Sequence, residues 1–281
     1  MTDELLALRD LIHERTGLFF RDGADIEFIG STLGRRIRQI GRASFTDYID
    51  MLNGDGKAAT DEWLEIITAL TINKSPFVRH ISYVNALAEH VVPEILRNKE
   101  EKELKIWSAG CSTGEEPLMI AMALSEAGWF DRARIEIHGS DGSITAIEKA
   151  RRGVYDNRKV EIGIAPEIRE KYFTRAGNDW RVRRELQAKI EFSIANIVDE
   201  SAIAPHASAD VIFCRTVLIY FSDESVADTL RLFEKYMPPG GYLFSDEGEH
   251  FERLAAETGL FEKVEYGEVV VWRKPLSSDH L

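Results

Sequence analysis

The sequence predicts an α/β protein in which a small all-helical domain precedes a mostly parallel sheet. Beyond residue 103, short apolar runs typical of strands alternate with helical patterns, as in parallel sheets covered on both faces. The chain before residue 72 shows helical periodicity instead. Short β-like runs then interrupt the alternation. The predicted parts are a helical domain (1–72), a linker (73–102) and a sheet domain (103–281) with an inserted antiparallel β-subdomain (172–197).

Composition and charge exclude several classes of protein. The chain of 281 residues is 44% hydrophobic, enough for a sizeable core, and its formal net charge is −13. Nucleic acids and anionic membranes attract basic surfaces, so neither is an expected partner. Membrane-span and signal-peptide patterns are missing, and Cys111 and Cys214 indicate neither a disulfide framework nor a metal cluster. We expect a cytoplasmic monomer without a metal.

The helical domain contains one basic stretch, "STLGRRIRQIGR" at residues 31–42. Its apolar residues Leu33, Ile37 and Ile40 recur at helical spacing, so the remaining face of the helix is cationic. A solvated helix face and a docking surface for an acidic helix both fit this pattern. The residues concerned are Arg35, Arg36, Arg38 and Arg42. Further helices are predicted over 3–16, 44–54 and 58–72, with breaks at "TGLFFRDG" and "NGDGK".

The sheet domain is read from its alternating elements. Helices are predicted over 117–127, 144–152 and 223–237. The strand-like runs are "LKIWSAG", "RIEIHGSD", "ADVIFCRTVLIYF", "GGYLFSDEG" and "EVVVWRK". Runs around "WRVR" and "KIEFSI", with the turn "AGND", predict the antiparallel insertion.

A ligand site is expected where the first two of these strands end, because open α/β sheets bind ligands at the carboxyl ends of their strands. "AGCSTGEEP" places small residues directly after the first strand and Pro117 in the first turn of a helix. Asp141 ends the second strand, where it is suited either to hold a ribose hydroxyl pair or to cap a helix. Neither G-x-G-x-x-G nor a phosphate-loop lysine is present, which argues against a nucleotide-dependent dehydrogenase.

Six motifs in order resemble one family: "NKSPFVRH", "WSAGCSTGEEP", "GSD", "ARRGVYD", "FCRTVLIYF" and "GGYLF". They are similar to those of the CheR-type methyltransferases, and the likeness covers roughly residues 3–272. The resemblance implies a Rossmann-like methyltransferase sheet and S-adenosylmethionine as cofactor, with S-adenosylhomocysteine as product. It also implies the formation of glutamyl methyl esters on the cytoplasmic helical bundle of chemoreceptors, in chemotaxis adaptation.

The resemblance also implies a set of cofactor-binding residues. Ala109 and Gly110 would meet the methionine part, and Glu116, ahead of Glu115, would lie near its amino group. Asp141 would hold the ribose. The other implied cofactor contacts are Asn73, Ser75, Arg79, Asn196, Ile197 and Thr216.

Arg79 and Tyr220 are the implied catalytic pair, Arg79 steering the substrate carboxylate and Tyr220 lying near the transferred methyl group. Without the resemblance, Arg79 also fits an exposed helix position and Tyr220 a place in the sheet core. Methyl transfer to an ionised glutamate needs no general base, which agrees with the lack of a nucleophile–histidine–acid pattern.

The chain departs from the family pattern at several positions: Val78, Leu118, Met119, Thr216 and the acidic run "SDEGE". These departures leave a second interpretation open, a divergent member that binds the cofactor as a sensor or adaptor or methylates another protein. The resemblance implies a chemoreceptor as partner, with the arginine face along its helices. The turn in "RAGNDW" is short, so we expect independence of a C-terminal tethering pentapeptide.

Overall fold

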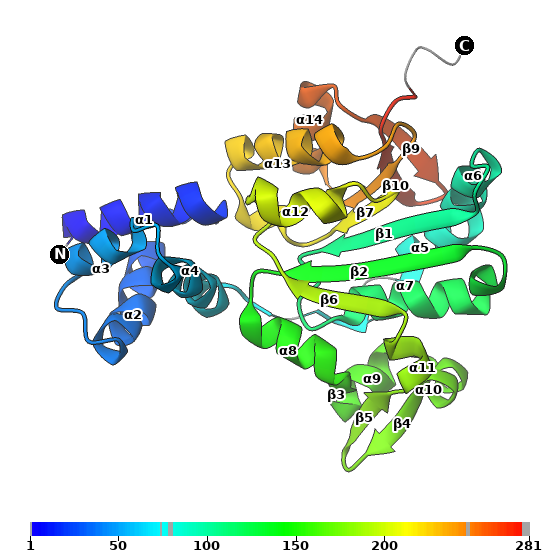
Figure 1. Cartoon of the computed structure of the whole chain (residues 1–281), viewed down its shortest axis with the longest axis horizontal. Coiled ribbons are helices and arrows are strands. Elements are labelled where there is room, and N and C mark those ends of the chain that lie inside the picture. Colours follow the sequence, from blue (N-terminus) through cyan, green and yellow to red (C-terminus); the bar gives the residue numbers. More distant parts are fainter. Residues whose placement is uncertain (1, 74, 78–80, 246–247, 277–281) are drawn as a thin grey trace.

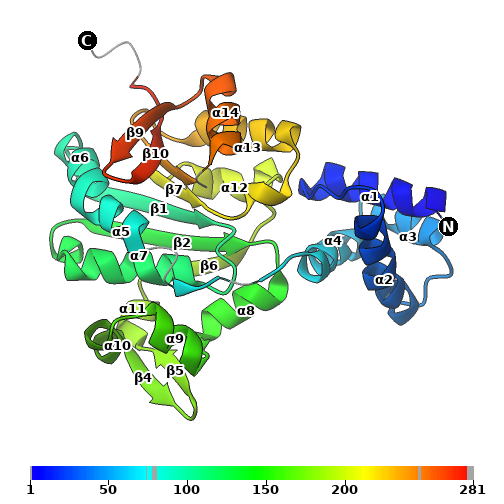
Figure 2. The same ribbon diagram turned by 180° about the vertical axis from the view of Figure 1, so that it is seen from behind.

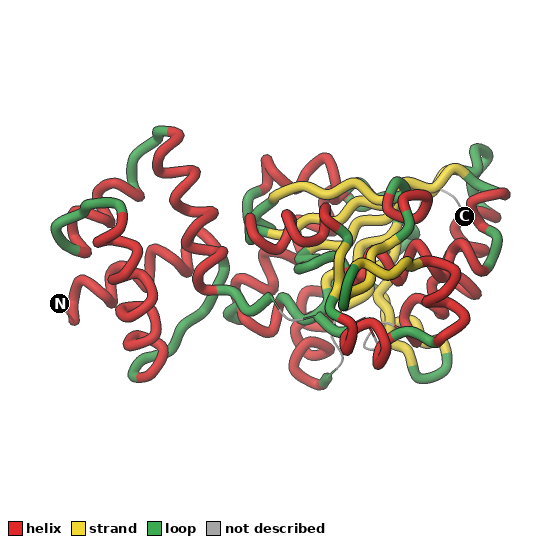
Figure 3. Tube along the Cα trace, turned by 90° about the horizontal axis from the view of Figure 1, so that it is seen from below, coloured by secondary structure: helices red, strands yellow, loops and turns green. Residues whose placement is uncertain are grey.

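The computed structural model describes residues 2–73, 75–77, 81–245 and 248–276. A bundle of four helices precedes the sheet domain, and all strands lie in the latter (Figures 1 and 3). These helices are α1 (Thr2–Thr16), α2 (Ala24–Gln39), α3 (Phe45–Leu52) and α4 (Lys57–Leu70). A loop after α4 leads into the sheet domain (Figure 2).

The main sheet has seven strands in the order β6-β2-β1-β7-β8-β10-β9. The first five in this order are parallel, whereas β10 is antiparallel to both β8 and β9. Their bounds are β1 (Glu103–Ala109), β2 (Arg134–Asp141), β6 (Ile190–Ile194), β7 (Val211–Cys214), β8 (Tyr242–Ser245), β9 (Glu262–Tyr266) and β10 (Val269–Arg273). The chain passes from β1 outward to β2 and β6 and then crosses to β7 on the other side of β1, so the strand order reverses between β1 and β7. The predicted α/β sheet is confirmed.

Helices cover both faces of this sheet (Figures 1 and 2). Alternation along β1 divides its side chains between the two layers: Ile106 belongs to the core under α5, α6 and α7, whereas Trp107 belongs to the core under α12, α13 and α14. The second core continues into the helical domain through Leu8, Ile29 and Leu70. The helices are α5 (Ile81–Ala86), α6 (Val92–Arg97), α7 (Glu115–Glu126), α8 (Ile144–Arg152), α12 (Glu200–Ala207), α13 (Asp223–Tyr236) and α14 (Glu249–Thr258), with a π-helical turn (Leu87–Val91) and two 3-10 turns (Trp129–Asp131 and Leu218–Tyr220).

The inserted subdomain differs from the prediction in its extent. Its sheet has the order β3-β5-β4, built from β3 (Val154–Tyr155), β4 (Phe173–Ala176) and β5 (Asp179–Val182). Helices α9 (Asn157–Gly163), α10 (Pro166–Tyr172) and α11 (Arg184–Gln187) pack around it (Figure 1). The run "KIEFSI" was wrongly placed here: it is β6, which pairs in parallel with β2 at the edge of the main sheet. The alternation of apolar and polar residues in this run cannot distinguish an edge strand from a hairpin strand.

The helical domain docks on the sheet domain through backbone and side-chain contacts. Leu18 forms an antiparallel bridge with Phe221, and the amide of Phe19 donates to the carbonyl of Tyr220 at 2.8 Å. Gly17 has φ of +74°, and a Cβ there would lie 2.7 Å from the Phe221 ring. Only glycine therefore allows this close approach.

Among the described residues, no helix has the length and apolar character that crossing a membrane requires.

Candidate active site

A cavity of about 950 Å³ lies where β1, β2 and β7 end, between the sheet domain and the helical domain. This is the position where the strand order reverses, and where open α/β sheets bind ligands. Six separate stretches of the chain contribute to its lining, within residues 16–28, 67–73, 110–116, 140–142, 195–197 and 215–221, together with Ser75. Predicted site residues that line it are Asn73, Ser75, Gly110, Glu116, Asp141, Asn196, Ile197, Thr216 and Tyr220.

The loop after β1 has an unusual backbone. Gly110, Ser112 and Gly114 have φ of +74°, +51° and +91°, and Ser112 is a rare non-glycine residue in this region. A Cβ on Gly110 would lie 2.3 Å from a methyl of Val217, which follows β7. Ala109 is fully buried at the end of β1 and does not line the cavity. Its predicted role is therefore limited to positioning Gly110.

Asp141, the last residue of β2, fixes two backbone turns at once. One carboxylate oxygen accepts from the amide of Ser112 at 2.9 Å and the other from that of Ser143 at 2.8 Å. Burial raises the pKa of Asp141, and these two backbone donors oppose the shift. Each oxygen keeps a second lone pair, so the carboxylate is able to accept hydroxyl donors from a ligand as well.

Two adjacent glutamates at the start of α7 have different surroundings. Glu116 lines the cavity, and one of its oxygens accepts from the Ser108 hydroxyl at 2.7 Å. Glu115 is fully buried outside the cavity lining, where it forms an ion pair with Lys159 of α9. Of the two glutamates, Glu116 alone is therefore placed to meet a ligand in the cavity.

The remaining predicted site residues in the described part of the chain come from three segments, which follow α4, β6 and β7. Asn73 donates from its amide to the Ser143 hydroxyl at 2.9 Å, while the Asn196 amide donates to the carbonyl of Arg15 at 2.8 Å. Thr216 has φ of +58°, which is strained for a β-branched residue. Tyr220 is 43% exposed, so it is not a core residue of the sheet. Arg79 lies outside the described residues.

The helical domain contributes to this cavity, which the sequence did not predict. Residues 18–22 were interpreted only as a helix break, yet they line the cavity together with Phe28 and residues from the end of α4. Three of these side chains are large, apolar and exposed: Phe19, Phe28 and Ile72. The two adjacent phenylalanines in "GLFFRDG" could have indicated this contribution, because exposed aromatic side chains in a loop often mark a binding surface.

The predicted arginine face is divided by the structure. Arg35 and Arg38 are exposed on α2. Arg36, in contrast, forms a two-point hydrogen bond with the buried carboxylate of Glu62 at 2.9 and 2.7 Å, and Tyr48 donates to the same carboxylate. Arg42 lies beyond the end of α2 and pairs with Asp47 at 3.0 Å. Arg36 and Arg42 therefore serve the fold of the domain, which narrows the predicted surface to Arg35 and Arg38.

Comparisons with known proteins agree with this geometry. Residues 73–269 match the SAM binding domain of CheR methyltransferases, and residues 3–71 match their all-alpha domain. The chain is 34% identical over 254 residues to "Chemotaxis protein methyltransferase" of Salmonella typhimurium, covering 89% of this chain and 84% of that protein. It is 32% identical over 263 residues to the protein of that name from Escherichia coli, covering 89% and 88%.

A solved structure of an O-methyltransferase family protein from Burkholderia thailandensis is similar at a TM-score of 0.44 and 13% identity, over 98% of this chain and 83% of that one. Similarity at this level supports no functional conclusion. The two matched domains together span nearly the whole chain, and they have the order found here, helices first and sheet second. The chain belongs to the CheR methyltransferase family.

Proposed function

We propose that this protein transfers the methyl group of S-adenosylmethionine to glutamate side chains on the cytoplasmic helical bundle of a chemoreceptor, and that the cavity is the site of this reaction. One observation carries the proposal. Residues expected to hold the cofactor and the acceptor come from stretches as distant in sequence as Asn73 and Tyr220, and they line one cavity at the strand ends.

Features of the cavity fit the cofactor. The Ser112 hydroxyl oxygen is buried on the wall and has no hydrogen-bond partner within the described part of the chain, so it has bonding capacity left for a ligand. The cradle at Gly110 leaves no room for a Cβ. Glu116 and Asp141 add acidic groups suited to a cationic ligand. In this assignment Glu116 faces the amino group, Asp141 holds the ribose, and Asn196 and Ile197 flank the adenine.

Bound S-adenosylmethionine supplies a methyl group activated by its sulfonium. A glutamate side chain has an ordinary pKa of ~4.3 and is already ionised at neutral pH, so this chain needs no general base. Its residues bind, orient and exclude water, and correct orientation supplies most of the acceleration. Tyr220, at the exposed side of the cavity, and Arg79 are the proposed positioning groups for the acceptor carboxylate.

The acceptor is proposed to approach along the helical domain. Arg35 and Arg38 present exposed charge to an acidic helix, and steering by such charges weakens as salt increases. Only Gly177 and Asn178 separate β4 from β5, which supports binding without a tethering pentapeptide. We further propose that the protein acts as a monomer.

The test is transfer of labelled methyl groups from S-adenosylmethionine to a purified chemoreceptor cytoplasmic fragment. Alkali should release the label as methanol, as expected of an ester, and replacing the acceptor glutamates by alanine should abolish the labelling. Addition of a tethering pentapeptide as competitor should not change the rate. Tight cofactor binding without any transfer would instead support the sensor or adaptor alternative. The structural feature that favours this alternative is the strained backbone at Thr216, a position where the chain departs from the family pattern.

A further inference from the structure

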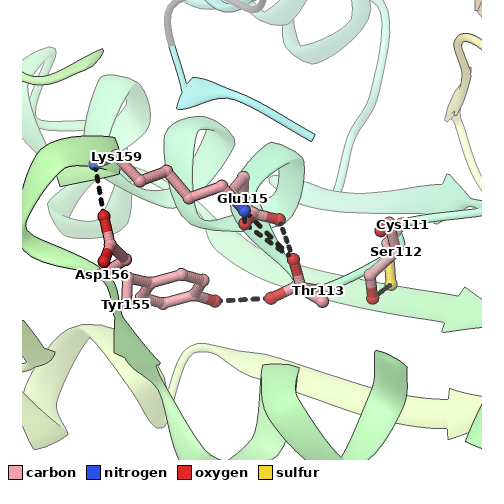
Figure 4. A network of polar contacts seen from close by, with 7 residues as sticks. All are labelled: Cys111, Ser112, Thr113, Glu115, Tyr155, Asp156 and Lys159. Carbon is pink, nitrogen blue, oxygen red and sulfur yellow. Dashed lines mark hydrogen bonds and ion pairs between the residues drawn. The ribbon is translucent and has the colours of Figure 1, made fainter. Parts of the chain in front are cut away.

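The ion pair between the buried Glu115 and the partly exposed Lys159 joins the inserted subdomain to the start of α7, directly after the loop that follows β1 (Figure 4). Glu115 begins α7 and is fully buried, whereas Lys159 belongs to α9 of the subdomain. The hydroxyl of Thr113, inside the loop, donates to the carboxylate of Glu115 at 2.7 Å. The Nζ of Lys159 also lies 3.4 Å from that hydroxyl oxygen. One cluster thus contains a loop residue, a helix-start residue and a subdomain residue.

Tyr155, on β3, makes a second connection to the same loop. Its hydroxyl donates to the carbonyl of Thr113 at 2.7 Å. Its ring packs edge-on against the ring of Phe77, with the two ring centroids 5.2 Å apart. Burial raises the pKa of Tyr155, so the hydroxyl remains a donor. A Cβ on Gly114 would lie 3.0 Å from the Tyr155 oxygen, so the loop lies tightly against the subdomain at this point.

The loop needs such external support. Gly110 and Gly114 adopt positive φ readily, but Ser112, with φ of +51°, is a non-glycine residue in a region that such residues rarely occupy. Backbone of this kind persists only where the surroundings over-determine it. Asp141 restrains the cavity side of the loop through the amide of Ser112, and Tyr155 with Lys159 restrains the opposite side.

We propose that Tyr155 and Lys159, neither of which lines the cavity, are positioning residues that hold the loop at residues 109–114 in the conformation that binds the cofactor. Lys159 acts through Glu115, and Tyr155 acts through the carbonyl of Thr113. The inserted subdomain therefore supports the cofactor site from outside the cavity lining. This inference rests on the proposed function, because it assumes that the cavity holds S-adenosylmethionine.

The first test is calorimetric titration of the full-length protein with S-adenosylhomocysteine. Tyr155→Phe removes one hydroxyl and keeps the ring, and we expect its Kd to rise about 5-fold, the effect of one lost hydrogen bond. The matched control is Tyr172→Phe, because this tyrosine of the same subdomain is also buried as a residue but its hydroxyl donates to Glu126, away from the loop. Its Kd should stay within about twofold of wild type.

A second variant separates positioning from stability. Lys159→Met alone strands the buried charge of Glu115, so its melting temperature should fall. In the double variant Lys159→Met with Glu115→Gln both charges are gone, and the melting temperature should recover. We expect its Kd to remain raised about 3-fold or more, since the tie to α9 is still missing. In a methylation assay, the KM for S-adenosylmethionine should rise while the KM for the acceptor protein stays unchanged.

The outcomes are distinct. Absence of S-adenosylhomocysteine binding by the wild-type protein would count against the proposed function itself. Wild-type affinity in Tyr155→Phe or in the double variant would overturn this inference and leave the proposed function standing. An equal loss of affinity in Tyr172→Phe would also overturn it, because the effect would then be general loosening of the subdomain.

Discussion

The two walls of the cavity come from different domains and differ in polarity. The sheet domain contributes hydrogen-bonding groups held by strand ends, such as Asp141, Glu116 and Ser112. The helical domain contributes mainly apolar side chains, including Phe19, Phe28 and Ile72, which are exposed at the cavity. A polar wall is suited to bind the cofactor, and an apolar wall is suited to exclude water from the reaction.

The walls also differ in how they are supported. The polar wall is anchored in a sheet whose strands are buried on both faces. The apolar wall depends on a domain of four short helices, which is stabilised internally by the Arg36–Glu62–Tyr48 cluster. Loss of one support should therefore disturb one wall more than the other. Variants of single residues test this difference.

Arg36→Met should weaken the apolar wall most. Removal of the guanidinium leaves the carboxylate of Glu62, which is 7% exposed, without its cationic partner. Because Arg36 is partly exposed, we expect a loss of about 2 to 3 kcal/mol in the free energy of unfolding, measured by urea denaturation. Arg38→Met is the control and should change it by less than about 0.5 kcal/mol. Equal effects of the two variants would contradict the structural role of Arg36.

Asp141→Ala should damage the polar wall selectively. The variant loses a carboxylate expected to accept ribose hydroxyls, and the amides of Ser112 and Ser143 lose their acceptor. We expect binding of S-adenosylhomocysteine to weaken by about 2 kcal/mol, roughly 30-fold in Kd by calorimetry. Asp141→Asn keeps the size and part of the bonding and should lose less. Unchanged affinity in Asp141→Ala would remove this residue from the proposed site.

Phe19→Ala should affect the acceptor side alone. Phe19 is 49% exposed, so its removal should leave the melting temperature nearly unchanged. If the ring shields the reaction and contacts the acceptor, kcat/KM for the acceptor protein should fall about 5-fold, a change of ~1 kcal/mol. The Kd for S-adenosylhomocysteine should not change. Ile162→Ala, at a more exposed apolar position of the subdomain outside the cavity lining, should leave kcat/KM unaltered.

The pH dependence of cofactor binding should be the smallest effect. The pKa of Asp141 is raised by burial, so the group takes up a proton at a higher pH than an ordinary aspartate does. A protonated carboxyl attracts a cationic ligand less, so affinity for S-adenosylmethionine should fall as pH is lowered through that raised pKa. Calorimetry from pH 7.5 to 5.0 should show this decline in wild type and a flatter profile in Asp141→Asn. Parallel profiles would exclude Asp141 as the titrating group.

The two glutamates of "GEEP" show what sequence alone can and cannot determine. Both stand at the start of a predicted helix, and both suit the positive end of its dipole. Sequence spacing cannot tell that Glu116 faces the cavity while Glu115 faces α9, because that depends on how the subdomain packs against α7. The same limit applies to Arg36, whose partner Glu62 lies on another helix.

Three features could be predicted from the sequence alone: the alternation of strands and helices, the helical first domain and the loop of small residues before Pro117. Periodicity, apolar runs and turn residues are local properties, and they predict local structure well. The family resemblance named nine of the residues that line the cavity, and the structure brings these nine together.

Three features became visible only in the tertiary structure. They are the order of the strands, the position of β6 at the edge of the main sheet, and the apolar side chains that the helical domain contributes to the cavity. The contacts of Lys159 and Tyr155 with the loop after β1 and the start of α7 also follow only from the tertiary structure. These features depend on contacts between residues far apart in the chain, and such contacts leave no periodic signal in either segment. The physical reason is that burial and pairing, rather than local propensity, select which surfaces meet.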